Sequence, residues 1–345
     1  MTDIKSMNME ELKDYVSSLG EKPFRAKQLY EWMHVKLAAS FDEMTNLSKD
    51  FRSKLKENAS LTCLQTEEVQ TSREDGTQKF LFQTEDHNYI ESVRMVYHHG
   101  VSVCISSQIG CRMGCSFCAS TIGGVIRNLT AAEMLDQVYR IQKEGKERVS
   151  NIVVMGMGEP FDNYENLIRF LHMITDADGL HISARNITVS TCGIVPGIRH
   201  FAEENLPVTL ALSLHASNQK IREEMMPVAK VWPLPEVLEA CQYYFDRTGR
   251  RITFEYSMAD HINDSEESAR ELGTLLKGKN CHINLIPINP VREKSYEQST
   301  REAILRFKKK LENYGINVTI RREMGRDIDG ACGQLRKRYI DTSEL

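Results

Sequence analysis

Apolar positions recur every three or four residues near the N-terminus and every second residue further on. Residues 9–59 follow the helical period in MEELKDYVSSLG, KPFRAKQLYEWMHVKL and SKDFRSKLKEN. From 62 to 107 the period falls to two in QKFLFQT, YIESVRMVY and VSVCISS, with turn signals in the Asp-Gly pair at 75–76 and the His-Gly pair at 99–100. The pattern predicts a helical N-terminal region followed by antiparallel strands.

Strand and helix patterns alternate through the rest of the chain. The strand-like stretches are NIVVM, NITVS, PVTLALSL, RITFEYS and CHINLIP, each followed by a helical pattern such as YENLIRFLHMI, and a capping box at 130–133 opens one further helix. With VCISS they make six strand–helix units, and INVTIRR adds a last strand. Repeated units of this kind build a parallel sheet, so the expected class is α/β, open or rolled into a partial barrel.

The changes of period also suggest how the chain is divided. We expect a helical accessory domain over 1–60 and a β connecting segment over 61–95. A partial α/β barrel over 96–315 and a C-terminal segment over 316–345 complete the division. No repeat or low-complexity linker marks these boundaries, which therefore rest on the patterns alone.

Composition narrows the class of protein. The 345 residues are 41% hydrophobic and 27% charged, which is ordinary for a globular protein, and no apolar run approaches the length of a membrane span. We therefore expect a cytoplasmic protein, in which nine cysteines stay reduced rather than forming a disulfide framework. The net charge of -4 argues against a general polyanion binder, so any nucleic-acid contact is expected to be local, at TIRREMGR, QLRKR and RFKKK.

Three cysteines stand close together in QIGCRMGCSFC. Cys111, Cys115 and Cys118 have the spacing C-x3-C-x2-C and follow the first strand of the alternating series, at the carboxyl edge where such sheets bind ligands. A structural zinc ion normally takes four ligands, and no second pair of ligands lies nearby. Three thiolates on a [4Fe-4S] cluster leave one iron open to a small molecule. Structural zinc and unrelated reduced cysteines remain open at this point.

Longer stretches carry a family resemblance over most of the chain. They are SSQIGCRMGCSFC, RNLT, MGMGEPFDN, ARNITVSTCGIVP, SLHASN, MPVAK, HINLIPINP and TIRREMGRDIDGACGQLR. The cysteine spacing with an aromatic residue before the last cysteine resembles the radical S-adenosylmethionine superfamily. The stretches together resemble its RlmN/Cfr family of RNA methyltransferases, and the RlmN branch in particular. The resemblance implies a partial (β/α)6 barrel that holds a [4Fe-4S] cluster on Cys111, Cys115 and Cys118.

The resemblance also implies roles for individual residues. Cys332 matches the cysteine that becomes S-methylated, Cys104 matches its partner thiol in a transient disulfide, and Glu91 matches the proposed proton acceptor. The positions that match the binding site of S-adenosylmethionine are Gly158, Glu159, Ser190, Ser213, Leu214, His215 and Asn289. Arg321, Arg322 and Arg326 are near Cys332 in sequence and are candidates to favour its thiolate.

An activity and a set of partners follow from the same resemblance. The implied reaction methylates C2 of an adenosine in the peptidyl transferase region of 23S rRNA and in the anticodon loop of tRNA, and it uses two molecules of S-adenosylmethionine per turnover. It needs an electron-donor protein such as a flavodoxin or ferredoxin, and a monomer without a membrane partner is expected. A Cfr-like enzyme acting on C8 of the same rRNA adenosine is the nearest alternative. A non-catalytic, metal-stabilised RNA-binding module is a more distant one.

Two residues depart from the pattern of the family. Cys192 stands where serine is expected, which places an extra thiol near Ser190, and Gly330 replaces an alanine shortly before Cys332 and would loosen that loop. We expect the remaining cysteines, Cys63, Cys192, Cys241 and Cys281, to be small packing residues.

Overall fold

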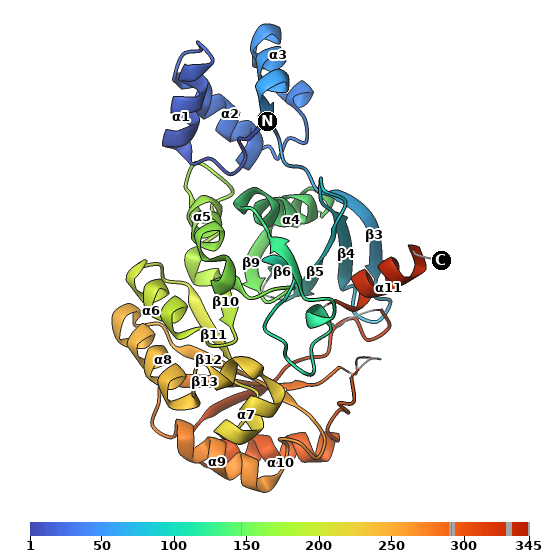
Figure 1. Cartoon of the computed structure of the whole chain (residues 1–345), viewed down its shortest axis with the longest axis vertical. Helices are drawn as coiled ribbons and strands as arrows, with labels where there is room; N and C mark the ends of the chain where they lie inside the picture. The colour runs from blue at the N-terminus through green and yellow to red at the C-terminus, as the bar shows by residue number, and fades with distance from the viewer. Residues whose placement is uncertain (99, 146, 290, 292–293, 329–332, 344–345) are drawn as a thin grey trace.

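One long sheet organises the protein, seen here in a computed structural model that describes residues 1–345 except 99, 146, 290, 292–293, 329–332 and 344–345 (Figure 1). Within these residues the sheet has ten strands in the order β14-β13-β12-β11-β10-β9-β6-β5-β4-β3. β6 and β9 to β14 pair parallel with one another, whereas β3, β4 and β5 pair antiparallel and extend the sheet beyond β6, with β5 antiparallel to β6. The parallel part is the partial α/β barrel that the sequence predicts.

The strands of this sheet are short. Their bounds are β3 Gln65–Thr71, β4 Gln78–Gln83, β5 Tyr89–Tyr97, β6 Gly100–Cys104, β9 Val149–Val154, β10 Ile187–Thr191, β11 Thr209–Ser213, β12 Ile252–Met258, β13 Cys281–Pro287 and β14 Asn317–Ile320. Two small pairs lie outside it, β1 Thr2–Asp3 with β2 Ala59–Ser60, and β7 Gln108–Gly110 with β8 Val125–Asn128.

Helices connect the parallel strands and form the N-terminal region. The α-helices are α1 Met9–Ser18, α2 Phe24–His34, α3 Lys49–Asn58, α4 Ala131–Glu144, α5 Tyr164–Thr175, α6 Val195–Glu203, α7 Gln219–Met225, α8 Leu234–Thr248, α9 Glu266–Leu276, α10 Arg301–Glu312 and α11 Gln334–Ser343. Short 3-10 turns are η1 Phe41–Glu43, η2 Ala119–Thr121, η3 Pro160–Asn163, η4 Ala184–Asn186 and η5 Pro227–Lys230. α1 to α3 lie at one end of the molecule, beyond α4 and α5 (Figure 1).

Most predicted elements are confirmed. The predicted strands coincide with β4, β5, β6 and β9 to β14, and the capping box that opens α4 is present between Thr130 and Glu133. The pattern missed β3, whose residues are largely exposed, the small pair β7–β8, and α11. β5 runs across position 95, so the connecting segment and the barrel share one sheet.

Buried polar contacts bind the N-terminal region to α4. Lys5 Nζ lies 2.7 Å from Asp136 Oδ1, and Asp136 Oδ2 accepts the backbone N–H of Leu64 at 2.7 Å. His34 Nδ1 lies 2.9 Å from the Tyr139 hydroxyl, and burial lowers the pKa of His34 to about 3, so the ring is neutral. The helical region is therefore held in one place on the barrel.

None of the helices in the described part of the chain has both the length and the apolar character that crossing a bilayer requires.

The Lys5–Asp136 pair gives a stability prediction. Both side chains are almost fully buried, so Lys5→Met leaves a carboxylate without its main cation and should lower the free energy of unfolding by about 3–5 kcal/mol. Thermal unfolding of the purified protein measures the effect. The control is Lys13→Met in the exposed Lys13–Glu10 pair, which should barely change Tm. Equal Tm shifts in the two variants would contradict the prediction that breaking the buried pair destabilises the fold more than breaking the exposed one.

Candidate active site

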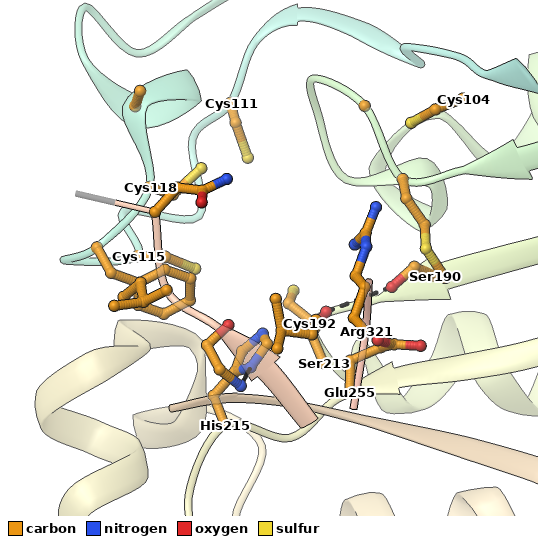
Figure 2. Close-up of a pocket in the computed structure, with 18 of the residues that line it drawn as sticks. Cys104, Cys111, Cys115, Cys118, Ser190, Cys192, Ser213, His215, Glu255 and Arg321 are labelled. Carbon is orange, nitrogen blue, oxygen red and sulfur yellow. Dashed lines mark hydrogen bonds between the residues drawn. The ribbon is translucent and has the colours of Figure 1, made fainter. Parts of the chain in front are cut away.

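A cavity of about 330 Å³ opens at the carboxyl edge of the parallel strands (Figure 2). The predicted site residues that line it are Cys104, Cys111, Cys115, Cys118, Gly158, Glu159, Ser190, Ser213, His215 and Asn289. They come from the ends of separate strands and from the loop after β7, and they meet because the carboxyl ends of parallel strands share one edge of a sheet. The structure thus brings together residues that are spread over most of the sequence.

The cysteine loop is held in shape by backbone contacts. Cys111 N donates to the carbonyl of Gly124 at 3.1 Å, and Ser116 N donates to the carbonyl of Met225 at 2.9 Å. Gly110 has φ +79°, and a Cβ there would lie 2.0 Å from the carbonyl oxygen of Gly124, so only glycine fits. The loop is therefore clamped between β8 and the end of α7.

Burial controls the charge state of the thiols. Desolvation raises the pKa of Cys111 to about 12 and raises the pKa of Cys115 as well, with the neighbouring Cys118 as a further cause in both. At neutral pH these two thiols therefore keep their protons unless a metal binds, and metal binding must release protons. Figure 2 shows Cys111, Cys115 and Cys118 along one side of the cavity.

The donor set fits an iron-sulfur cluster. No three His, Cys, Asp or Glu side chains of the described residues gather closely enough to hold a single ion, but a cluster does not need that convergence because each thiolate binds a different iron. Arg222 on α7 lies close enough to Cys115 to act on its pKa, is fully buried, and has Nε and Nη1 without a hydrogen-bond partner among the described residues. A buried cation beside this wall favours an anionic group in the site.

The loop after β9 interlocks with the cysteine loop. Glu159 N donates to Gln108 Oε1 at 2.8 Å, and Glu159 Oε2 accepts the N–H of Cys192 at 2.8 Å. Gly158 has φ +102°, and a Cβ there would lie 2.6 Å from the Gln108 side chain. Burial raises the pKa of Glu159, whose carboxylate is already engaged by backbone donors. These residues therefore shape the cavity wall through the backbone.

Polar side chains from β10 and β11 form another wall. Ser190 Oγ and Ser213 Oγ lie 3.3 Å apart, as the dashed line in Figure 2 marks. His215 Nδ1 accepts the N–H of Ser257 at 3.0 Å, and burial lowers the pKa of His215 to about 3. The edge of the Phe117 ring meets His215 with ring centroids 5.0 Å apart. A neutral histidine and two hydroxyls can bind the amine, carboxylate or ribose of a small ligand.

Three residues that line the cavity were not predicted as part of the site: Glu255 was not predicted at all, and Arg321 and Cys192 were given other roles. Glu255 in β12 is buried at the cavity floor, where Asn284 Nδ2 donates to it at 2.9 Å and burial raises its pKa. Arg321, a candidate only for the Cys332 thiolate, lines the cavity close enough to Glu255 to act on its pKa (Figure 2). Cys192, taken for a packing residue, lines the cavity wall. A charged residue inside the apolar run of RITFEYS was the available signal for Glu255.

Two predicted residues do not line this cavity, and a third lies outside the described residues. Leu214 is fully buried in the hydrophobic core, and its side chain does not reach the cavity. Glu91 is buried on β5 and makes other contacts. Cys332, with Gly330 before it, lies outside the described residues.

Comparisons with known proteins match the chain over nearly its whole length. Residues 2–61 match the ribosomal RNA large subunit methyltransferase N-terminal domain, and residues 105–272 match the radical SAM superfamily. Two curated proteins, from Lachnospira eligens and Lachnoclostridium phytofermentans, are each named probable dual-specificity RNA methyltransferase RlmN. They are 60% and 59% identical, over 99% and 98% of this chain and 97% and 95% of theirs.

A solved structure is also similar. It is the crystal structure of a radical SAM methyltransferase from Sphaerobacter thermophilus, with a TM-score of 0.93 and 41% identity. The alignment covers 97% of this chain and 99% of that one.

The cavity wall offers a paired test of the cluster ligands. Cys115→Ala removes one thiolate and should reduce bound iron and acid-labile sulfide to near background in anaerobically purified protein. Cys192→Ala removes a second buried thiol of the same cavity and should retain both. Iron retention in the Cys115 variant, or equal loss in both variants, would contradict the ligand assignment.

Proposed function

Because this chain belongs to the RlmN family of radical S-adenosylmethionine RNA methyltransferases, we propose that it methylates C2 of an adenosine in 23S rRNA and in tRNA through an S-methylated Cys332. Its relatives are named dual-specificity RNA methyltransferase RlmN, which supports action on two kinds of RNA and the RlmN branch, for which the resemblance implies C2. A Cfr-like enzyme acting on C8 would use the same cysteines, so it is the names of the relatives, and not the cavity, that favour C2.

One observation carries the proposal. Cys104 lines the same cavity as Cys111, Cys115 and Cys118, together with the polar ends of β10 and β11. An RNA-binding module stabilised by a metal needs neither Cys104 in that cavity nor the interlocked loop that carries Glu159. The gathering of a further thiol, a cluster-type motif and a polar pocket therefore favours the enzyme.

The cysteines do chemistry that a simple methyl transfer cannot do. C2 of adenine lies between two ring nitrogens and is too electron-poor to attack a methyl group. When bound at Cys111, Cys115 and Cys118, the cluster with S-adenosylmethionine supplies a methyl group and a radical that removes one hydrogen atom from a methyl group. The Cys332 thiolate takes the methyl group. After this methyl group has lost one hydrogen atom, its carbon bonds to C2, so the RNA is covalently attached to the protein through Cys332.

Release of the RNA needs a base and a second thiol. The C2 proton leaves to Glu91 or Cys104, and the unpaired electron of the adduct returns to the electron-transfer system that supplied it, so that the ring is aromatic again. The Cys104 thiolate then attacks the sulfur of Cys332, which breaks the bond between that sulfur and the new carbon and forms a disulfide, while the released carbon takes a proton and becomes the methyl group. A cellular thiol reductant restores the two cysteines for the next turnover.

Each segment of the chain has a proposed role, and a separate protein supplies electrons. We assign residues 1–60 to an RNA-binding accessory domain, 61–95 to a connecting segment, 96–315 to the barrel and 316–345 to the segment that carries Cys332. The match of residues 2–61 to an rRNA methyltransferase N-terminal domain supports the first of these. A flavodoxin or ferredoxin is the proposed electron donor for a cytoplasmic monomer.

Cys332 is proposed to act before the protein–RNA adduct forms and Cys104 after it, so replacing them should have different results. Cys332→Ala should form neither S-methylcysteine nor an RNA adduct while it still binds the cluster. Cys104→Ala should methylate Cys332 and attack RNA, then stall as a protein–RNA conjugate. Digestion with nuclease and peptide mass spectrometry detect the adduct on the Cys332 peptide. Normal turnover by either variant would sink the mechanism.

A second prediction concerns the phosphate-binding face. Arg322 is exposed at the cavity mouth, whereas Arg338 of QLRKR pairs with Glu68 at 2.8 Å. Arg322→Gln should weaken RNA binding and reduce the slope of log affinity against log salt by about 1, because one fewer counterion is released. Arg338→Gln is the control and should leave the slope nearly unchanged. The reverse result would place the phosphate contact on α11.

A further inference from the structure

A buried ion pair lies in the antiparallel part of the sheet, outside the cavity. Lys79 on β4 and Glu91 on β5 are 3.0 Å apart between Nζ and Oε2, and their side chains are 1% and 4% exposed. The proposed mechanism uses Glu91 only as a possible base and gives Lys79 no task. Burying two charges is costly, and such a pair is weak evidence for stability alone, so its presence calls for a reason.

The carboxylate of Glu91 also holds the start of the last helix. Glu91 Oε2 accepts the N–H of Gly333 and Oε1 accepts the N–H of Arg336, both at 2.6 Å. Gly333 directly precedes α11 and Arg336 lies in its first turn, where backbone N–H groups lack helical partners and where a negative charge is favourable. Glu91 therefore caps α11 from a strand that lies more than two hundred residues earlier in the chain.

The same antiparallel strands also bind the chain before Cys332, the cysteine that is proposed to carry the methyl group. Asp75, in the turn between β3 and β4, accepts the N–H of Gly325 at 3.0 Å. Asp327 in turn accepts the N–H of Arg73 at 2.8 Å. The hairpin of β3 and β4 and the strand β5 thus bind the chain on both sides of Cys332.

Gly333 lies directly against the end of the cysteine loop. Its φ is +86°, and a Cβ there would lie 2.9 Å from Ser120 N and 3.1 Å from Ala119 C, two residues that follow Cys118. Gly333 is also the neighbour of Cys332 in the chain. A residue that fixes Gly333 therefore fixes one end of the carrier segment beside the proposed cluster.

We propose that Lys79 is a positioning residue that holds Glu91 as an anchor for α11, so that the chain at Gly333 stays against the cysteine loop. The inference rests on the proposed function of Cys332 and adds the group that places it. Lys79 holds the Glu91 carboxylate in one orientation in a buried site, and that carboxylate accepts the backbone N–H groups of Gly333 and Arg336. Glu91 is thus an anchor while α11 is docked, and it can accept a substrate proton only by giving up one of these donors.

The test separates positioning from general stability. Hydrogen–deuterium exchange of the peptide that contains the first turn of α11 is measured in the full-length, cluster-loaded protein without RNA. S-methylation of Cys332 after addition of S-adenosylmethionine is followed by mass spectrometry in the same samples. Lys79→Met should speed exchange of that turn about tenfold or more, and slow S-methylation by a similar factor. Lys79→Arg should keep part of both.

A matched control exists in the same chain. Lys5→Met breaks the equally buried Lys5–Asp136 pair between the N-terminal region and α4, and should change neither the exchange of α11 nor the rate of S-methylation. If Lys79→Met does not fold, Glu91→Gln keeps the size of the side chain and should show the same faster exchange.

Several outcomes would overturn the proposal. One is an α11 turn in the unmodified protein that exchanges as fast as an undocked peptide. Another is unchanged exchange or unchanged S-methylation in the folded Lys79 and Glu91 variants, and a third is an equal effect of Lys5→Met. The proposed function fails separately, if the unmodified protein with cluster and S-adenosylmethionine never methylates Cys332, and the exchange data would still report on the anchor.

Discussion

The cavity depends on a buried polar network that joins the loop after β6 to the loop after β9. Ser106 is its centre, because its hydroxyl donates to the carbonyl of Glu91 at 2.7 Å and accepts the N–H of Met157 at 3.0 Å. Gln137 on α4 accepts the N–H of Ser106 at 2.8 Å, and Asn163 donates to the carbonyl of Ser107 at 2.8 Å. These bonds join the two loops to each other and to α4, so the loops have one arrangement, and it positions the cysteines that follow in the chain.

Much of this arrangement follows from local sequence. Periods of two and of three to four residues located the strands and helices, and parallel strands bring their carboxyl ends to one edge whatever the details of packing. That is why Cys104, Ser190 and Ser213, far apart in sequence, could be expected in one place. Leu214 shows the limit, since a neighbour of two cavity residues on a strand end can face the core instead.

The rest of the fold and of the site depends on contacts between distant residues, which no short stretch of sequence predicts. β3 has exposed residues and no clear alternation, so its pairing with β4 decides its structure. Glu91 looks like an ordinary strand residue in YIESVRMVY, and its burial follows from Lys79 on one neighbouring strand and from α11 at the other end of the chain. Arg222 likewise resembles an exposed helix residue in the sequence, but it is fully buried in the fold. Long-range contacts of buried charges leave little trace in a local pattern.

The docking of α11 also has a consequence for how the protein is made. A ribosome releases the chain from its N-terminus, so β4 and β5 emerge long before the amides of Gly333 and Arg336, which lie 242 and 245 residues downstream of Glu91. Until these amides leave the ribosome, the Lys79–Glu91 pair has no helix to cap, and the barrel can close without α11. This contact therefore forms late in synthesis, and products truncated before Gly333 would lack it however well their barrel forms.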